Sequence, residues 1–158
     1  MNNKYALITG GTAGIGLDIA KELAKQGHNI ILTARREERL KEISASLKKE
    51  FNIDCAYIAA DLAQVSAPEM IYNFCFKNNY IVEILVNNAG YSINKKFHET
   101  GEDEEEKFLR VLGIAVVALT KKFIPSMIEQ KYGKIMMVSS LASFAPPSSG
   151  WGALYGPV

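Results

Sequence analysis

Cysteine is scarce in this chain, with only Cys55 and Cys75 among 158 residues. These two cysteines lack the close spacing of a zinc site, and they cannot provide the disulfide framework of a small secreted protein. Histidine is equally rare, and His28 and His98 stand apart from other metal-ligating residues, so we expect no metal site. Nothing in the cysteine usage suggests an oxidising compartment, and we expect a cytoplasmic protein.

An excess of charge of one sign is also missing. The chain has 18 basic and 17 acidic residues and a net charge of +1, so neither a nucleic acid nor an acidic membrane surface is an expected partner. No continuous apolar run approaches the roughly 18 residues of a membrane span. The residues before the first glycines are too few to form a signal peptide. The length suits one domain over residues 1–158.

Apolar segments of strand length alternate with helix-like segments along the chain. We expect strands at residues 4–9, 29–34, 54–60, 82–87 and 133–139, and helices at 14–26, 37–50, 66–78 and 103–130. This alternation predicts an α/β fold with a doubly wound parallel sheet and helices on both faces. Such a sheet usually has about six strands. We therefore expect a sheet incomplete at its C-terminal side, and a chain that is a fragment or completes its sheet with a partner.

A glycine-rich turn, T-G-G-T-A-G-I-G at residues 9–16, lies between the first predicted strand and helix. Glycines there permit a tight turn and let the backbone approach a pyrophosphate, which meets free N–H groups at the helix N-terminus. The turn therefore predicts dinucleotide binding, although a plain strand-to-helix turn is the alternative. The candidate cofactor contacts in this turn are Gly10, Thr12, Gly14, Ile15 and Gly16.

Three further blocks follow later predicted strands: D-L at 61–62, N-N-A-G at 87–90, and S-S at 139–140 followed by Tyr155. In this order and spacing, the four blocks resemble the short-chain dehydrogenase/reductase family over the whole visible chain. The resemblance implies a Rossmann domain, a nicotinamide cofactor, and hydride transfer between a small-molecule carbonyl compound and its alcohol. It also implies cofactor contacts on the adenosine side from Asp61, Leu62, Asn88, Ala89 and Gly90. A turn or helix-cap role for Asp61 is the alternative.

Two arginines, Arg35 and Arg36, follow the second predicted strand. An acidic residue at this position binds the ribose 2′-hydroxyl in this fold, whereas an arginine accommodates a 2′-phosphate. The pair therefore favours NADP(H) over NAD(H). A solvated pair that opens the next helix is the alternative.

The resemblance implies that Tyr155 is the acid/base and that Ser140 polarises the substrate carbonyl. The family places a lysine four residues after the tyrosine, which here would directly follow Val158, so we expect the chain to be cut inside this motif. Two features depart from the family. Ser140 and Tyr155 are 15 residues apart, about two more than usual, and Leu112 stands where an asparagine holds a water of the proton relay.

Two other functions stay open from the sequence. A dinucleotide-binding module without turnover would explain the missing asparagine and lysine. An epimerase or dehydratase is disfavoured because that branch usually shortens the glycine turn. The resemblance also implies a homo-oligomer, a dimer or tetramer. Its candidate surface is a helical stripe of Phe108, Val111, Ala115 and Leu119, unless this stripe covers the sheet.

Overall fold

The computed structural model describes residues 3–141. Their five strands form one parallel sheet in the order β3-β2-β1-β4-β5, which confirms the predicted doubly wound α/β fold. The strands are β1 (Lys4–Thr9), β2 (Asn29–Ala34), β3 (Cys55–Ala59), β4 (Ile81–Asn87) and β5 (Lys134–Met137). All five lie close to the ranges that the sequence predicts.

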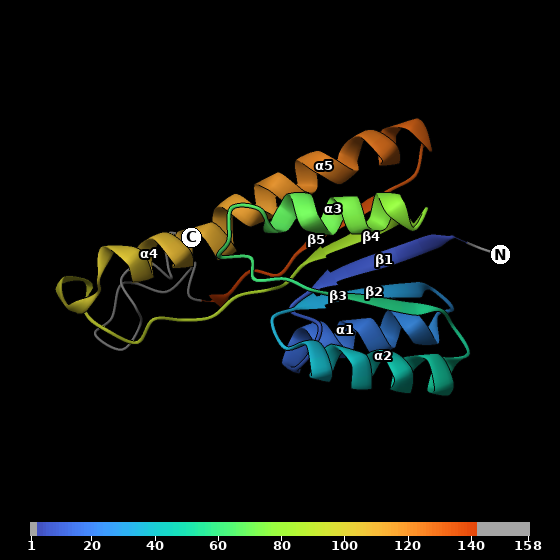
Figure 1. Cartoon of the computed structure of the whole chain (residues 1–158), viewed down its shortest axis with the longest axis horizontal. Helices are drawn as coiled ribbons and strands as arrows, with labels where there is room; N and C mark the ends of the chain where they lie inside the picture. Colours follow the sequence, from blue (N-terminus) through green and yellow to red (C-terminus); the bar gives the residue numbers. More distant parts are fainter. Residues whose placement is uncertain (1–2, 142–158) are drawn as a thin grey trace.

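Helices cover both faces of the sheet. Helices α1 (Gly14–Lys25) and α2 (Glu37–Phe51) lie on one face, and α3 (Ala67–Lys77) and α5 (Ala115–Glu129) lie on the other (Figure 1). Successive side chains of a strand point to opposite faces. In β1, Tyr5 and Leu7 therefore enter the core beneath α3 and α5, while Ala6 and Ile8 enter the core beneath α1 and α2. This double burial explains why the central strands are continuously apolar.

The fourth predicted helix is one helical stretch, Glu102–Glu129, with a π turn inside it. A short 3-10 helix, η1 (Phe97–Glu99), precedes α4 (Glu102–Leu109), and a π turn, η2 (Arg110–Ile114), separates α4 from α5. The Ala115 N–H bonds the carbonyl of Arg110, five residues back, instead of four. A π turn adds a residue to one turn of the helix without a distinctive residue type, so helical periodicity did not reveal it.

The prediction that a stripe on this helix forms an oligomer surface is wrong, because the stripe is not exposed. Phe108, Val111, Ala115 and Leu119 are all buried. Val111, Ala115 and Leu119 join the core between α5 and the sheet, as the alternative interpretation predicted. The opposite side of the same helical stretch instead exposes Leu109, Ile114, Val117 and Ile128.

The stretch Glu102–Glu129 is long and apolar enough to cross a membrane by length and composition, with a mean hydropathy of 1.7 in its most apolar window. A core helix of a globular protein passes the same test, and here Phe123 and Met127 pack on the sheet core. The lack of a continuous apolar run therefore does not by itself exclude a membrane partner. The prediction of no membrane partner stays a prediction.

Strand β5 forms one edge of the sheet in the described part of the chain. Ile135, Met136 and Met137 are between 37% and 56% exposed there. An apolar edge strand with unpaired backbone groups is a hazard for aggregation. The sheet is thus incomplete on this side, as predicted.

Candidate functional site

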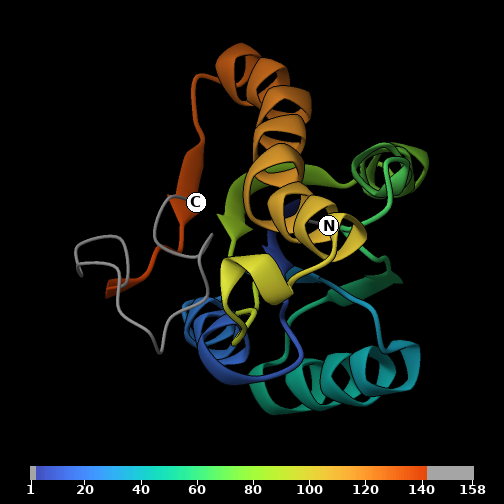
Figure 2. The ribbon, with the colours of Figure 1, turned by 90° about the vertical axis from the view of Figure 1, so that its left-hand side faces the viewer.

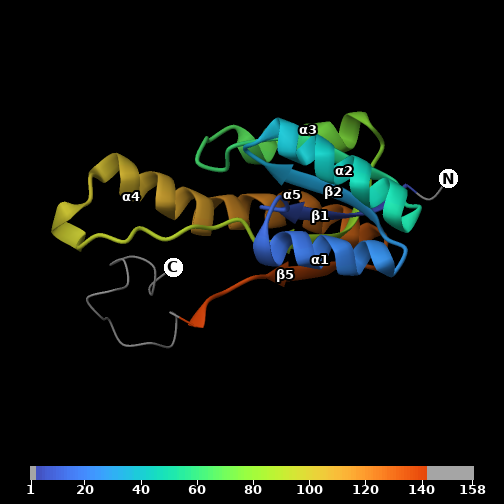
Figure 3. The same ribbon diagram turned by 90° about the horizontal axis from the view of Figure 1, so that it is seen from below.

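A cleft with a volume of about 1120 Å³ lies at the carboxyl ends of the strands. Helix α4 projects beyond these strand ends (Figure 1, Figure 3). Figure 2 shows the molecule from this side, with α4, in yellow, in front. In doubly wound sheets, ligands bind outside the carboxyl ends of the strands, where the chain switches from one face to the other. Here β1 and β4 are the adjacent strands that lead to opposite faces.

The structure brings the predicted cofactor residues together in the wall of this cleft. Those in the wall are Gly10, Thr12, Gly14, Ile15, Gly16, Arg35, Arg36, Asp61, Leu62, Asn88, Ala89 and Gly90. Ser139 and Ser140 line the same cleft from the segment after β5. Tyr155 lies outside the described residues, so its predicted role stays a prediction.

The glycine turn approaches its neighbours closely. A Cβ atom on Gly16 would lie 2.3 Å from Asn88 Nδ2 and 2.6 Å from the Gly10 carbonyl oxygen, so only glycine fits. Helix α1 begins at Gly14, and Ala13 provides no side-chain cap for its first N–H groups. Uncapped N–H groups at a helix N-terminus favour an anion, and here they belong to residues that line the cleft.

A set of hydrogen bonds joins the end of β1 to the end of β4. Thr9 Oγ1 accepts from the backbone N–H groups of Asn88 at 2.9 Å and Ala89 at 3.0 Å, and donates to the Val86 carbonyl at 3.3 Å. In return, Asn88 Nδ2 donates to the Thr9 carbonyl at 2.9 Å and to the Gly10 carbonyl at 3.4 Å. The Asn88 amide nitrogen therefore holds the glycine turn, while the residue still lines the cleft.

The two arginines follow β2 directly and are exposed. Among residues 3–141, neither Arg35 nor Arg36 forms an ion pair, although Glu37 and Glu38 come next in the sequence. Guanidinium groups without a carboxylate partner can bind a phosphate in the cleft through paired N–H donors. Both arginines therefore lie where they can contact an anionic group in the cleft.

Asp61 stabilises its own turn, which was the alternative to a role in cofactor binding. Its Oδ1 accepts a hydrogen bond from the Ala63 N–H at 3.1 Å, which is the geometry of an aspartate that caps its own turn. Asp61 is also the only carboxylate among the described residues that line the cleft. The turn bond fixes the side chain at the end of β3, where the other oxygen can accept from a ligand.

Tyr91 and Lys107 are among the cleft residues that sequence reasoning missed. The Tyr91 ring lies edge-on to Phe108, with centroids 5.4 Å apart. Burial raises the pKa of Tyr91, and the positive charge of Arg35 opposes this rise. Its position directly after N-N-A-G was the available signal. Lys107 ends an acidic run, and nothing in that run indicated that it faces the cleft.

Leu112 also lines the cleft, from the π turn. A Cβ atom on Gly90 would lie 2.9 Å from Leu112 Cδ2, so the leucine packs directly on the segment after β4. Leu112, the departure noted in the sequence, is therefore an apolar side chain in the cleft wall.

The comparison with protein families agrees with this geometry. The family model for the short chain dehydrogenases matches residues 4–156. The chain belongs to the short-chain dehydrogenase family. The matched range includes the glycine turn, the N-N-A-G block and the two serines after β5.

Known proteins similar to this chain include reductases with different substrates. A fatty acyl-CoA reductase of Acinetobacter baylyi is 32% identical over 92% of this chain and 50% of its own length. A very-long-chain 3-oxoacyl-CoA reductase of Rattus norvegicus is 31% identical over 90% of this chain and 46% of its own. The structure of L-sorbose reductase from Gluconobacter frateurii with NADPH and L-sorbose has a TM-score of 0.90 and 28% identity, covering 99% of this chain and 60% of that one. The chain spans about half the length of these curated relatives.

Proposed function

We propose that this chain carries the cofactor half and part of the catalytic site of an NADP(H)-dependent oxidoreductase that interconverts a carbonyl compound and an alcohol. The observation that carries the proposal is a single cleft that contains both the glycine turn and Ser140. Family membership supports the reaction class, and the NADPH complex of L-sorbose reductase supports the cofactor class.

Each part of the cleft has a role in this proposal. The N–H groups at the start of α1 bind the pyrophosphate, and Arg35 and Arg36 bind the 2′-phosphate. The bound nicotinamide supplies or accepts the hydride. Ser140 donates a hydrogen bond to the substrate oxygen and polarises the carbonyl. Tyr155 gives its proton to that oxygen as the carbonyl is reduced, and takes it back in the reverse direction.

The arginines test the cofactor half. Arg35→Ala should weaken NADP⁺ binding about tenfold or more, because a phosphate loses a charge-assisted contact, while NAD⁺ binding changes little. Isothermal titration calorimetry with both nucleotides measures the ratio. Arg39→Ala is the matched control, since Arg39 lies one turn into α2, pairs with Glu42 and does not line the cleft. Equal losses for NADP⁺ and NAD⁺ would contradict the assigned preference.

Tyr155 tests the catalytic half. In a protein that turns over ketones with NADPH, Tyr155→Phe should lower kcat by at least about 100-fold while the Kd for NADPH stays within about twofold, because only the proton donor is removed. Absorbance at the reduced nicotinamide band follows turnover, and fluorescence titration follows binding. Unchanged kcat in the variant would remove Tyr155 from the mechanism.

A second candidate, a dinucleotide-binding module without turnover, is favoured by Leu112 in the cleft wall. An apolar side chain cannot hold a relay water by hydrogen bonds. This candidate is supported if the wild type binds NADPH but reduces no member of a broad ketone and aldehyde panel. Any turnover that Tyr155→Phe abolishes would refute it.

For the remaining biology, we propose a small-molecule carbonyl substrate, a homo-oligomer and a cytoplasmic location. Family membership supports the first two. Two buried free thiols, Cys55 and Cys75, support a reducing compartment. Light scattering of the purified protein would test the oligomer, and a monomeric mass at micromolar concentration would argue against it.

A further inference from the structure

Lys107 is a cation of the cleft that the proposed cofactor chemistry does not use. It lies on α4, one turn before Val111 and about a turn before Leu112, and all three residues line the cleft. Residues three or four apart share one face of a helix. The side of α4 that continues into the cleft wall therefore carries a lysine at its outer end.

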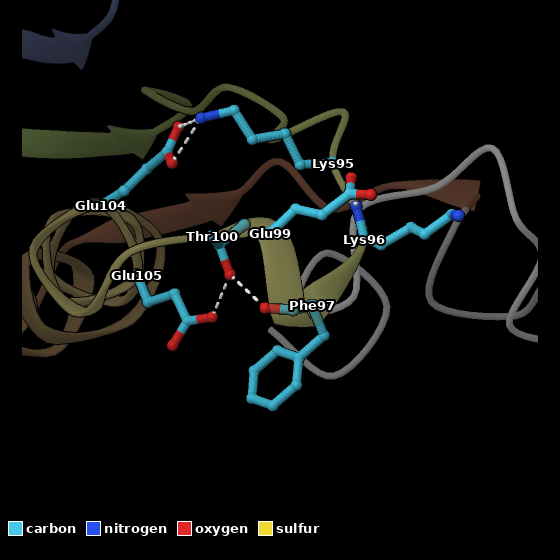
Figure 4. Close-up of polar contacts among 7 residues, drawn as sticks. All are labelled: Lys95, Lys96, Phe97, Glu99, Thr100, Glu104 and Glu105. Atoms are coloured by element: carbon cyan, nitrogen blue, oxygen red, sulfur yellow. Dashed lines mark hydrogen bonds and ion pairs between the residues drawn. The ribbon is translucent and has the colours of Figure 1, made fainter.

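Three of the five acidic residues that directly precede Lys107 bind other partners. Glu104, at i−3, forms a two-oxygen contact with Lys95 Nζ at 2.8 and 3.1 Å. The Thr100 hydroxyl, which has one proton to donate, lies within hydrogen-bond reach of both the Glu105 carboxylate and the Phe97 carbonyl (Figure 4). Figure 4 also shows the turn before α4, where the Lys96 backbone N–H donates a hydrogen bond to the Glu99 carboxylate.

Glu106, directly before Lys107, forms an ion pair with Arg110, one helical turn later, at 2.6 Å. Within the described range 3–141, Lys107 itself forms no ion pair or hydrogen bond with a side chain, even though five acidic residues directly precede it. The local contacts thus engage three of the five carboxylates. Asp103, at i−4, forms no ion pair with Lys107 in the described range, so the ammonium stays available to a ligand.

The charges in the cleft are unbalanced. Among its described lining residues, three cations, Arg35, Arg36 and Lys107, oppose the single carboxylate of Asp61. The arginines lie together after β2, whereas Lys107 comes from α4, and the neutral donors Ser92 and Asn94 line the cleft from the segment that leads to α4. A cleft with excess charge of one sign attracts ligands of the other sign.

We propose that Lys107 binds an oxyanion of the carbonyl substrate, so that this enzyme takes substrates with a carboxylate or phosphate group rather than neutral ketones. This inference rests on the proposed function, because it assumes that a carbonyl substrate enters the same cleft. The ammonium contacts the anionic group and does not take part in the transfer of hydride or proton.

The test uses three probes that share one 3-oxo group: acetoacetate, acetoacetyl-coenzyme A and neutral ethyl acetoacetate. Each is titrated calorimetrically into the chain saturated with NADP⁺, where the oxidised cofactor cannot reduce the ketone. We expect Lys107→Gln to weaken one of the two anionic probes about five- to tenfold and to leave ethyl acetoacetate unchanged. Lys107→Arg should keep most of the affinity. If Lys107→Gln loses affinity for acetoacetate alone, Lys107 binds a substrate carboxylate. If it loses affinity for acetoacetyl-coenzyme A alone, Lys107 binds a substrate phosphate.

The matched control is Lys121→Gln, because Lys121 is exposed on the following helix and does not line the cleft. A wild type that prefers neither anionic probe to ethyl acetoacetate overturns the proposal, as does an equal effect of Lys107→Gln on all three. A loss of affinity for 2′,5′-ADP in Lys107→Gln would instead assign the lysine to the cofactor. A wild type that does not bind NADP⁺ refutes the proposed function, and the same probes on the cofactor-free chain still test Lys107.

Discussion

Thr9 and Thr33 show how differently two residues of one type can act. They are register partners in β1 and β2, and both are buried. Thr9 Oγ1 makes three hydrogen bonds that join the ends of β1 and β4. Thr33 Oγ1 is buried without a hydrogen-bond partner among the described residues. A buried hydroxyl without a partner lowers stability, whereas a fully bonded one supports the structure.

This contrast gives a matched pair of substitutions. Thr9→Val should lower the free energy of unfolding by about 1–3 kcal/mol, because two part-buried N–H groups lose their acceptor. Thr33→Val should change the free energy by less than about 0.5 kcal/mol or raise it, since no bond is lost. Urea unfolding without cofactor measures both. Equal destabilisation by the two substitutions would show that Thr9 does not connect the two strand ends.

Tyr91 illustrates why some site residues were missed. The N-N-A-G block indicated that the chain leaves β4 at the cleft, but the block does not specify the direction of the next side chain. The contact between Tyr91 and Phe108 of α4 sets that direction, and the two residues come from different elements. Contacts of this kind depend on tertiary packing, which a local motif does not contain.

At the scale of elements, the glycine turn combines two different requirements. Gly14 has a φ of +52°, but a Cβ atom added there would meet no other atom within 4 Å, so this position needs glycine for its backbone conformation alone. Gly16 has no such φ, yet a Cβ there would overlap Asn88 and the Gly10 carbonyl. The same residue type thus meets a conformational need at one position and a packing need two residues later.

Alanine substitutions separate these needs. Gly14→Ala should destabilise the protein by about 1 kcal/mol, the usual cost of a left-handed conformation. Gly16→Ala should destabilise it by more than about 2 kcal/mol and reduce NADPH affinity at least tenfold, because Asn88 and the turn must move. Thermal unfolding and fluorescence titration measure the two effects. A smaller effect for Gly16→Ala than for Gly14→Ala would contradict the packing argument.

Helix α4 and the π turn show the limit of periodicity. Glu102–Glu106 correctly indicated a helix start, because acidic side chains complement the helix dipole there. The extra residue of the π turn changes the direction of side chains on its two sides and brings Leu112 into the cleft wall. We infer that the π turn, rather than the type of any residue, allows α4 to line the cleft and α5 to pack on the core.

At the scale of the whole molecule, each of the two cores contains one buried thiol. Cys55 lies in the core beneath α1 and α2, and Cys75 lies in the core beneath α3 and α5. Burial raises the pKa of Cys55 to about 11 and that of Cys75 to about 12, from an ordinary value near 9. A thiolate is thus much less favourable in the folded chain than in the unfolded chain.

The sign of the pH dependence follows from these shifts. Below pH 9 both states hold the protons, and above it the unfolded thiols ionise first, so stability should fall by up to about 1.4 kcal/mol per pH unit for each thiol. Guanidinium unfolding between pH 8 and 10 measures this slope. Cys75→Ala should lower stability at pH 8 through lost packing and reduce the slope above pH 9. An unchanged slope in that variant would mean that Cys75 ionises equally in both states.

The sequence by itself determined the order of elements and the fold class, and it predicted residues that the structure brings together in one cleft. These features depend on local patterns: apolar runs form buried strands, and a glycine turn between a strand and a helix positions N–H groups for an anion. Arg35 and Asp61 could be placed because parallel strands end at one edge of the sheet. Only the tertiary structure decided that the Phe108 stripe is buried, that Leu112 lies in a π turn at the cleft, and that Lys107 lines the same cleft. These outcomes depend on how a helix is rotated against the sheet and on which carboxylates already bind a neighbouring cation, and neither can be obtained from the spacing of residues along the chain.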